Sequence, residues 1–229
     1  MRAIKIWKDP YGEGFDTCKA DSITFLPGVS ILVGCNGSGK TTLMLNIQEV
    51  LKKEKIPFYY FNNADKDTHS PSVALYNEDY ELASTRISSS EGENIVISLG
   101  EFFKNIREFM TTGRIKTKLD NFVESIGMGK YQEPTTKERW ILLDAIDSGF
   151  SIDNIVAVKE LLHNICKDAA AQGYILYIIL SVNAYEFADR EFCIDVISGQ
   201  NLSFNSYEKY KDFILKSKKE KDKRYEKNN

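Results

Sequence analysis

Nine consecutive residues of this sequence have the types and the spacing that phosphate binding requires. The stretch reads GCNGSGKTT, and its candidate ligand-binding residues are Gly34, Asn36, Gly37, Ser38, Gly39, Lys40, Thr41 and Thr42. Glycines let the backbone take positive φ, so that successive N–H groups approach a polyphosphate, and the following helix adds the positive end of its dipole. In this spacing we expect Lys40 to reach the β and γ phosphates and the Thr41 hydroxyl to ligate Mg²⁺. The alternative is a plain glycine turn between a strand and a helix.

A phosphate loop of this kind needs an acid at the end of a neighbouring strand to complete the Mg²⁺ shell. Asp144 directly ends the apolar run RWILLD, and it is the predicted magnesium residue together with Thr41. The other interpretation is a strand-terminal acid that caps the next turn. The two sites together predict a nucleotide polyphosphate with Mg²⁺ as the ligand.

Hydrophobic periodicity predicts the elements that position these residues. Apolar or alternating runs predict strands at 2–7, 22–26, 29–33, 57–61, 139–144 and 174–180, with a closing hairpin from 191–197 and 201–204. Helical spacing predicts helices at 41–53, from about 95 to 110 and from 152 to about 169. This order indicates an α/β fold with a mainly parallel core sheet and an antiparallel side layer.

The composition indicates one α/β unit in a reducing compartment. Of 229 residues 42% are hydrophobic, and the net charge of −3 gives no global sign of nucleic-acid or anionic-membrane binding. The four cysteines lie far apart without C-x-x-C spacing, which argues against zinc and disulfides: Cys18, Cys35, Cys166 and Cys193. No run is long enough for a signal peptide or a membrane span, so we expect a cytoplasmic protein without membrane insertion.

Charge is concentrated near the C-terminus. Lys209 to Lys227 holds nine Lys or Arg against four Asp or Glu. We therefore expect residues 1–205 to form one head and residues 206–229 to form a basic helix or a frayed tail. Such a helix usually presents a solvated face, and contact with a nucleic-acid backbone is the alternative.

Four blocks occur in the order found in ABC-type ATPase heads, and the chain resembles that family. The blocks are GCNGSGKTT (34–42), SSEGE (89–93), ILLDAIDSGFS (141–151) and IILSVN (178–183). The first block is most similar to the soluble SMC and RecF-like branch. The resemblance spans most of residues 1–205, with poor correspondence at 62–87 and 112–137. It implies a P-loop NTPase with a three-layer ABC-ATPase-like fold, ATP and Mg²⁺ as ligands, and a reduced helical lid with the signature region at about 62–137.

The resemblance also implies a dimer. Ser90, Gly92 and Glu93 match the family's signature motif, which contacts the γ-phosphate bound to the opposite protomer. A hydroxyl, a glycine amide and a helix N-terminus would form a second anion site, so ATP would be held between two heads. The alternative is an ordinary Ser/Glu helix cap.

Two positions depart from the family's catalytic pattern. Ala145 stands where the family has a glutamate that polarises water, and Asn183 stands where it has a histidine that senses the γ-phosphate. Ala145 cannot orient water with its side chain, so hydrolysis is expected to be slow. Asp147 is the nearest substitute, and Asn183 can still donate a hydrogen bond to phosphate. The predicted catalytic residues are therefore Asp144, Asp147 and Asn183.

Two further family positions have open assignments. Tyr11 or Phe15 would stack on adenine, although each is a good candidate for ordinary packing. Asn62 or Asn63 stands nearest to the family's glutamine, which contacts Mg²⁺ and water.

The leading hypothesis is an ABC/SMC-like ATPase that dimerises around ATP and Mg²⁺ and gates a protein partner by binding or slow hydrolysis. The resemblance favours DNA-related, mobile-element or defence biology, with DNA as a possible ligand. One alternative is a non-hydrolysing ATP-gated switch or scaffold, which Ala145 and Asn183 favour over a fast enzyme. The second alternative is the ATP-binding subunit of an ABC transporter, which predicts a larger lid and a clear glutamine loop.

Overall fold

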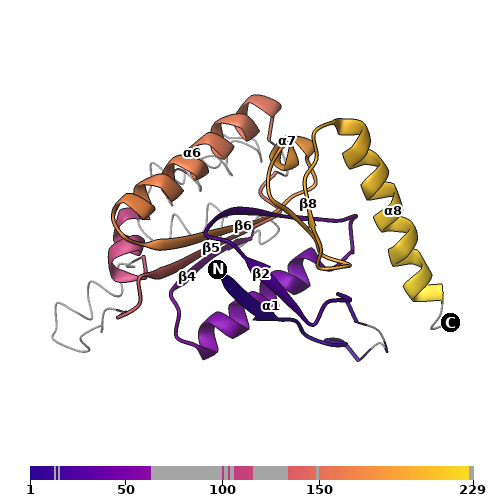
Figure 1. Ribbon diagram of the computed structural model, residues 1–229, viewed down its shortest axis with the longest axis horizontal. Coiled ribbons are helices and arrows are strands. Elements are labelled where there is room, and N and C mark those ends of the chain that lie inside the picture. The colour runs from indigo at the N-terminus through magenta and orange to yellow at the C-terminus, as the bar shows by residue number, and fades with distance from the viewer. Residues whose placement is uncertain are drawn as a thin grey trace, which may run out of the picture.

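The computed structural model describes residues 1–12, 14, 16–62, 100, 103, 106–115, 134–147 and 150–226, with side chains described up to 224 (Figure 1). Its strands are β1 (Arg2–Lys5), β2 (Ser22–Phe25), β3 (Gly28–Val33), β4 (Phe58–Asn62), β5 (Glu138–Asp144), β6 (Ile175–Ser181), β7 (Cys193–Asp195) and β8 (Asn201–Leu202). Its helices are α1 (Lys40–Lys53), α6 (Ile152–Ala171), α7 (Tyr185–Ala188) and α8 (Tyr207–Glu226), and residues 106–112 are also helical.

The central sheet has six strands in the order β4-β5-β6-β3-β7-β8. Strands β4, β5, β6, β3 and β7 pair in parallel, and only the short β8 is antiparallel to its neighbour. Strand β3 lies inside the sheet between β6 and β7. The loop after β3 therefore opens at the carboxyl edge of the sheet, where ligands bind in open α/β folds.

Both faces of this sheet are covered, which explains why its strands are continuous apolar runs instead of alternating ones. Successive residues of one strand pack into different clusters, since side chains alternate across a sheet. The cluster under α6 contains Ile141, Leu143, Ile178 and Leu180, whereas the cluster over α1 contains Trp140, Leu142, Tyr177 and Ile179. In the second cluster the rings of Trp140 and Tyr177 stack at 4.3 Å. Figure 1 shows α6 and α1 on opposite sides of the sheet.

The N-terminal strands form a separate two-stranded antiparallel sheet beside α1. Ile4, Ile23 and Phe25 pack with the buried face of α1 in the second cluster. Asn46 of α1 also fixes the layer by hydrogen bonds, because its Oδ1 accepts the Trp7 N–H at 2.9 Å and its Nδ2 donates to the Lys5 carbonyl at 3.2 Å. This side layer brings the loop after β1 close to the N-terminal end of α1.

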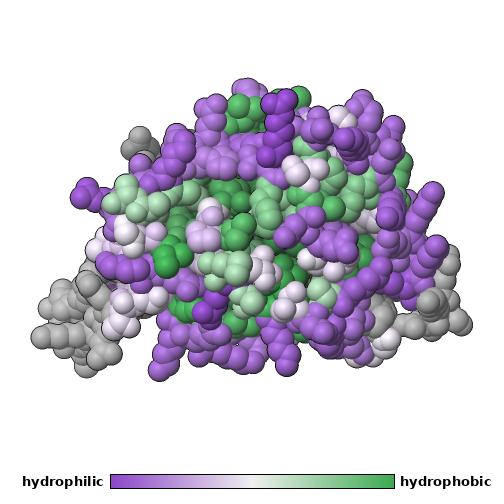
Figure 2. All heavy atoms as spheres, viewed as in Figure 1, coloured by the Kyte–Doolittle hydropathy of each residue, from purple (hydrophilic) through white to green (hydrophobic). Residues whose placement is uncertain are grey.

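The C-terminal segment is a helix that packs on the head. Tyr210 of α8 is 4% exposed, and its ring meets the ring of Phe204 edge-on at 5.2 Å. Ser217, two turns further along, is also 4% exposed. Figure 2 shows hydrophilic residues along the outer side of α8, whereas hydrophobic residues gather in the middle of this view. Helix α8 therefore buries one stripe and exposes most of its charge.

The predicted fold class is confirmed: the fold is α/β, with a mainly parallel core sheet and an antiparallel side layer. The predicted strands and the helices at 41–53 and 152–169 are present, with small differences at their ends. The predicted lid and signature region, about 62–137, lies largely outside the described residues. Among the described helices, none has the length and apolarity needed to cross a bilayer.

Candidate functional site

The predicted site residues at the ends of β3, β5 and β6 come together at the carboxyl edge of the sheet, because the strand register aligns the ends of four strands. Asn62 pairs with Asp144, Asp144 pairs with Ser181, and Ser181 pairs with Leu32 near the end of β3. The phosphate loop (residues 34–39) therefore begins beside two polar strand ends, Asp144 and Ser181. Asn62, the candidate for the glutamine position, lies one strand beyond Asp144.

The phosphate loop has the backbone that its glycines predict. Gly34 has φ of 155°, and a Cβ at this position would lie 2.5 Å from Ser38 Oγ. Gly39 has φ of 104° and forms the N-cap of α1 without a side-chain hydrogen bond to the helix. The first N–H groups of α1 therefore have no side-chain cap. Unsatisfied N–H groups at a helix N-terminus attract an anion.

Lys40 begins α1 and is buried under the phosphate loop. Its Nζ donates to the carbonyls of Gly34 (2.8 Å) and Cys35 (3.3 Å) and to Oδ1 of Asn183 (3.0 Å). Burial lowers the pKa of Lys40 from its ordinary value of 10.5, an effect that the carboxylates of Asp144 and Asp147 partly oppose. The ammonium group thus ties the loop after β3 to the loop after β6.

Asp144 has the environment expected of a carboxylate that binds a cation. It is 1% exposed, and its Oδ2 accepts a bond from the Tyr60 hydroxyl at 3.4 Å. Its Oδ1 is buried and has no hydrogen-bond partner within the described part of the chain. A buried polar atom without a partner is costly. One carboxylate oxygen, a threonine hydroxyl and phosphate oxygens are a normal Mg²⁺ shell, so the residues present fit this cation.

Three buried polar atoms without partners lie at this same site. They are Ser38 Oγ, Asp144 Oδ1 and Arg224 Nη2, and all three residues line one cavity. The set contains an anionic acceptor and a cationic donor, which suits a metal and an anion bound together. Within the described residues no cluster of three or more His, Cys, Asp or Glu side chains is placed to hold a metal by itself. Mg²⁺ would therefore depend on the phosphates for part of its shell.

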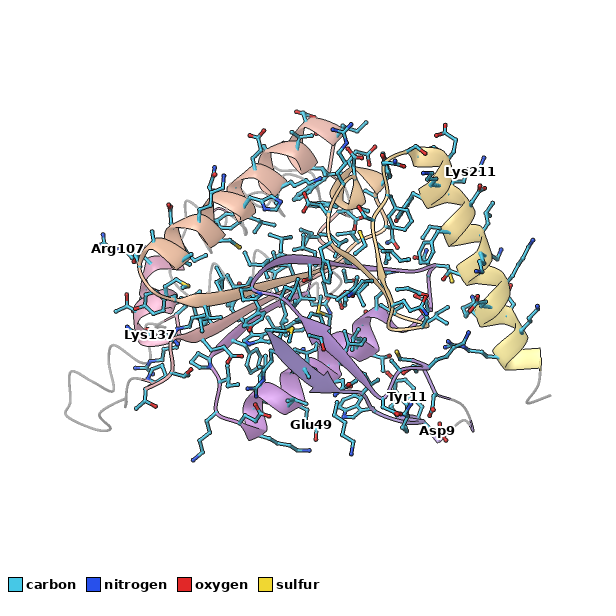
Figure 3. The ribbon with its side chains drawn as sticks, in the orientation of Figure 1. Asp9, Tyr11, Glu49, Arg107, Lys137 and Lys211 are labelled. Atoms are coloured by element: carbon cyan, nitrogen blue, oxygen red, sulfur yellow. The ribbon has the colours of Figure 1, made fainter. Side chains whose placement is uncertain are left out.

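The cavity has a volume of about 300 Å³ and is lined in part by the phosphate loop. Its lining residues are Tyr11, Thr17, Asn36, Gly37, Ser38, Gly39, Lys40, Thr41, Thr42, Asp144, Ala145, Ser181, Asn183, Lys221 and Arg224. Tyr11, a candidate for stacking on the base, lies in the loop after β1 and is 60% exposed (Figure 3). Its hydroxyl is 2.9 Å from Thr42 Oγ1. The cavity lining therefore includes both the polar residues Asp144 and Asn183 and an aromatic ring.

Asp147 does not line this cavity. Its Oδ2 accepts the N–H groups of Asn183 and Ala184, each at 2.6 Å, just before helix α7. This contact fixes the loop that carries Asn183. The direct catalytic role of Asp147 stays a prediction, and the geometry gives this residue a positioning role. Ala145 does line the cavity, and its φ of 54° is in the left-handed region that non-glycine residues rarely adopt.

Helix α8 supplies site residues that the sequence did not indicate. Ser217 Oγ accepts the Cys35 N–H at 3.1 Å, and the Tyr210 hydroxyl donates to the Asn183 carbonyl at 2.7 Å. Lys221 and Arg224, one and two turns further on, line the cavity. The basic composition of the segment was evident, but its position over the phosphate loop was not. The available signal in the sequence was the helical spacing of the residues that α8 turns toward the rest of the molecule.

Several predicted residues lie outside the described part of the chain. These are Ser90, Gly92 and Glu93 of the candidate signature motif, together with Phe15 and Asn63. The predicted contact in trans therefore stays a prediction. All four cysteines are free in the structure, and Cys35 is buried within the phosphate loop.

Comparison with known proteins gives likenesses in structure alone. No protein-family model matches the chain, and a search of the curated proteins finds no match. Among solved structures, the chain is similar to CbiO1 from Clostridium perfringens, described as part of the ABC transporter complex CbiONQ. The two are 14% identical, the match covers 87% of this chain and 86% of that one, and the TM-score is 0.44. At this TM-score the likeness carries no argument about function.

Proposed function

We propose that this chain binds ATP with Mg²⁺ in the cavity along the phosphate loop. The observation that carries the proposal is the grouping of complementary unsatisfied atoms around an uncapped helix N-terminus, with Lys40 beside them. Phosphates would accept the N–H groups that begin α1 and the ammonium of Lys40. Asp144 and Thr41 would hold the cation that neutralises the phosphates. Tyr11, which lines the same cavity, is available to the base.

We further propose that the chain is an ABC-type head of the SMC and RecF-like kind, which dimerises when ATP is bound. The support is the order of the four sequence blocks, together with a parallel sheet that places the first, third and fourth blocks at one edge. The second block would close on the nucleotide of another protomer. The dimer would gate a protein partner, in DNA-related, mobile-element or defence biology.

Slow hydrolysis is part of the proposal. Ala145 lines the cavity next to Asp144 but carries no group that could accept a proton from water. Asp147 and Tyr210 hold the backbone of Asn183 by hydrogen bonds, and Lys40 donates to its side-chain amide, so this amide would be available to a γ-phosphate bound beside Lys40. These features favour tight binding over fast turnover. They also favour the second candidate function, an ATP-gated switch or scaffold that does not hydrolyse ATP.

Calorimetry with ATP at millimolar Mg²⁺ tests the binding proposal. We expect Lys40→Met to lower the affinity of the protein for ATP by about tenfold or more, because a charge-assisted hydrogen bond is lost. Lys53→Met is the matched control, since Lys53 is on the same helix, is exposed and pairs with Glu49. Absence of ATP uptake by folded wild-type protein would contradict the proposal.

Phosphate release and sedimentation separate the two candidate functions. Slow turnover that rises with protein concentration, together with an ATP-dependent dimer, is expected for the ATPase. Dimers held by ATP without turnover are expected for the switch. A chain that binds ATP, stays monomeric and shows no turnover, with and without DNA, would contradict both.

A further inference from the structure

We infer that Lys221 and Arg224 of α8 bind the polyphosphate of the ligand, so that the C-terminal helix forms a second cationic wall of the nucleotide site. This inference rests on the proposed function, because it names further residues that hold the same ligand. It goes beyond the sequence motifs, which assign the phosphates to the phosphate loop, Lys40, Asn183 and the candidate signature motif.

The first observation is the stripe that α8 turns toward the head. Tyr210, Ile214, Ser217, Lys221 and Arg224 follow one another at intervals of three or four residues, which places them on one face of the helix. The stripe starts apolar where it packs against the core and becomes basic where it reaches the cavity. At this end Lys221 and Arg224 are half-buried, and Lys221 Nζ lies 3.4 Å from Oδ1 of the more exposed Asp222. A partly buried cation gains more from a further anion than an exposed one does.

The second observation is that this face is fixed directly on the phosphate loop. The hydrogen bond from the Cys35 N–H to Ser217 Oγ joins the loop to the middle of α8. One turn further on, Lys221 Cδ lies 3.7 Å from the position that a Cβ on Gly37 would occupy, and its Nζ lies 4.0 Å from that position. The Lys221 ammonium is therefore next to the backbone that would surround the phosphates.

The third observation concerns the hydrogen-bond donors of Arg224. Its Nη1 donates to the Thr17 carbonyl at 2.8 Å, which fixes the guanidinium at the cavity wall. Its Nη2 is buried and has no partner among the described residues. The N–H donors of a guanidinium form a planar fork that suits phosphate oxygens, so Nη1 is used for positioning and Nη2 is left for the ligand.

The other lysines of α8 provide the contrast. Lys218, Lys219 and Lys223 are exposed, and none of them lines the cavity. Figure 3 likewise shows Lys211 pointing away from the head at the start of α8. The basic character of α8 thus has two parts, a solvated one and a pair of cations at the nucleotide site.

The test compares binding of ATP and of inorganic tripolyphosphate, both with Mg²⁺, by calorimetry. We expect Lys221→Ala and Arg224→Ala each to weaken the binding of both ligands by about tenfold or more, and Arg224→Lys to recover part of the loss. Lys223→Ala is the matched control, because it removes the same charge from the solvated side of the same helix. The salt dependence of binding should become shallower in the two cavity variants and stay unchanged in the control.

Each result decides a separate question. No ATP binding by the wild-type protein contradicts the proposed function itself. ATP binding by the wild type, with unchanged affinity in Lys221→Ala and in Arg224→Lys, contradicts the second wall and leaves the proposed function standing. A loss in Arg224→Ala that appears together with a lowered melting temperature, while Lys221→Ala binds normally, also contradicts it, since Arg224 would then act through Thr17 alone.

Discussion

Replacing Asp144 by Asn should make the protein more stable without ligand and less responsive to ligand. Asp144 is 1% exposed, its Oδ1 has no partner among the described residues, and its Oδ2 has a long 3.4 Å bond from Tyr60. An amide of the same shape removes a poorly satisfied buried charge. A buried group without a partner costs about 1–3 kcal/mol, and more when it is charged, so replacing the charge by a neutral amide should raise the free energy of unfolding by about 1 kcal/mol after the lost attraction to Lys40 is subtracted.

With ligand bound, we expect the wild-type protein to be more stable than Asp144→Asn. Saturation at about 100 times the dissociation constant stabilises a binding protein by about 2.7 kcal/mol. Wild-type protein should show this gain with ATP and Mg²⁺ in urea unfolding, and Asp144→Asn should show much less, because the amide does not ligate Mg²⁺ well. Asp212→Asn, an exposed change on α8, controls for the loss of one carboxylate. Equal ligand gains in wild type and Asp144→Asn, or a destabilised variant without ligand, would refute the assignment of Asp144 to the cation.

Three further predictions concern the phosphate loop and its supports. Ser217→Ala leaves the buried Cys35 N–H without its acceptor, so urea unfolding should show a loss of about 1–3 kcal/mol. The affinity for ATP should fall as the pH rises toward 10.5, because burial lowers the pKa of Lys40 in the free protein. Above that pKa, ATP binding must be coupled to the uptake of a proton. Calorimetry in buffers of different ionisation enthalpy measures the affinity and the number of protons taken up. Asp147→Ala releases the N–H groups that hold the Asn183 loop, so phosphate release should fall more than ATP affinity does.

Each of these predictions has an outcome that counts against it. For Ser217, a loss no larger than that of the exposed Ser203→Ala would mean that α8 does not support the loop. For the pH series, an ATP affinity independent of pH up to 10.5 would mean that Lys40 keeps its proton in the free protein. For Asp147, full turnover in the Ala variant would remove the residue from both the catalytic and the positioning role.

The parts of the fold that could be predicted are those whose signal is local. The run before the phosphate loop, its glycines and the helix that begins at Lys40 are contiguous, so periodicity and turn chemistry identify β3 and α1. Asp144 was predicted in the same way, since an acid that ends a buried strand is conspicuous. The pairing of Asp144 with Ser181 follows from strand order, which periodicity does not specify.

The parts that could not be predicted depend on contacts between distant segments. The bond from Cys35 to Ser217 joins residues 182 positions apart, and no local pattern indicates it. Asp147 was predicted as a catalytic substitute from its distance to Asp144 along the chain. Its hydrogen bonds to the loop of Asn183, 36 positions away, show how the same acid can be used to fix a backbone. Sequence spacing identifies which side chains lie near each other along the chain, whereas their hydrogen-bond partners depend on the tertiary fold.

The position of α8 has a thermodynamic consequence for the proposed function. One helix contacts the loop after β3 through Ser217, the loop after β6 through Tyr210, and the ligand cavity through Lys221 and Arg224. Any free energy that these cations add to ATP binding must equally stabilise the docked position of α8, because linkage between two sites is reciprocal. Nucleotide occupancy would thus be communicated to the C-terminal surface of the molecule without hydrolysis. Under the proposed function, a chain with Ala145 next to Asp144 can therefore still act as a switch.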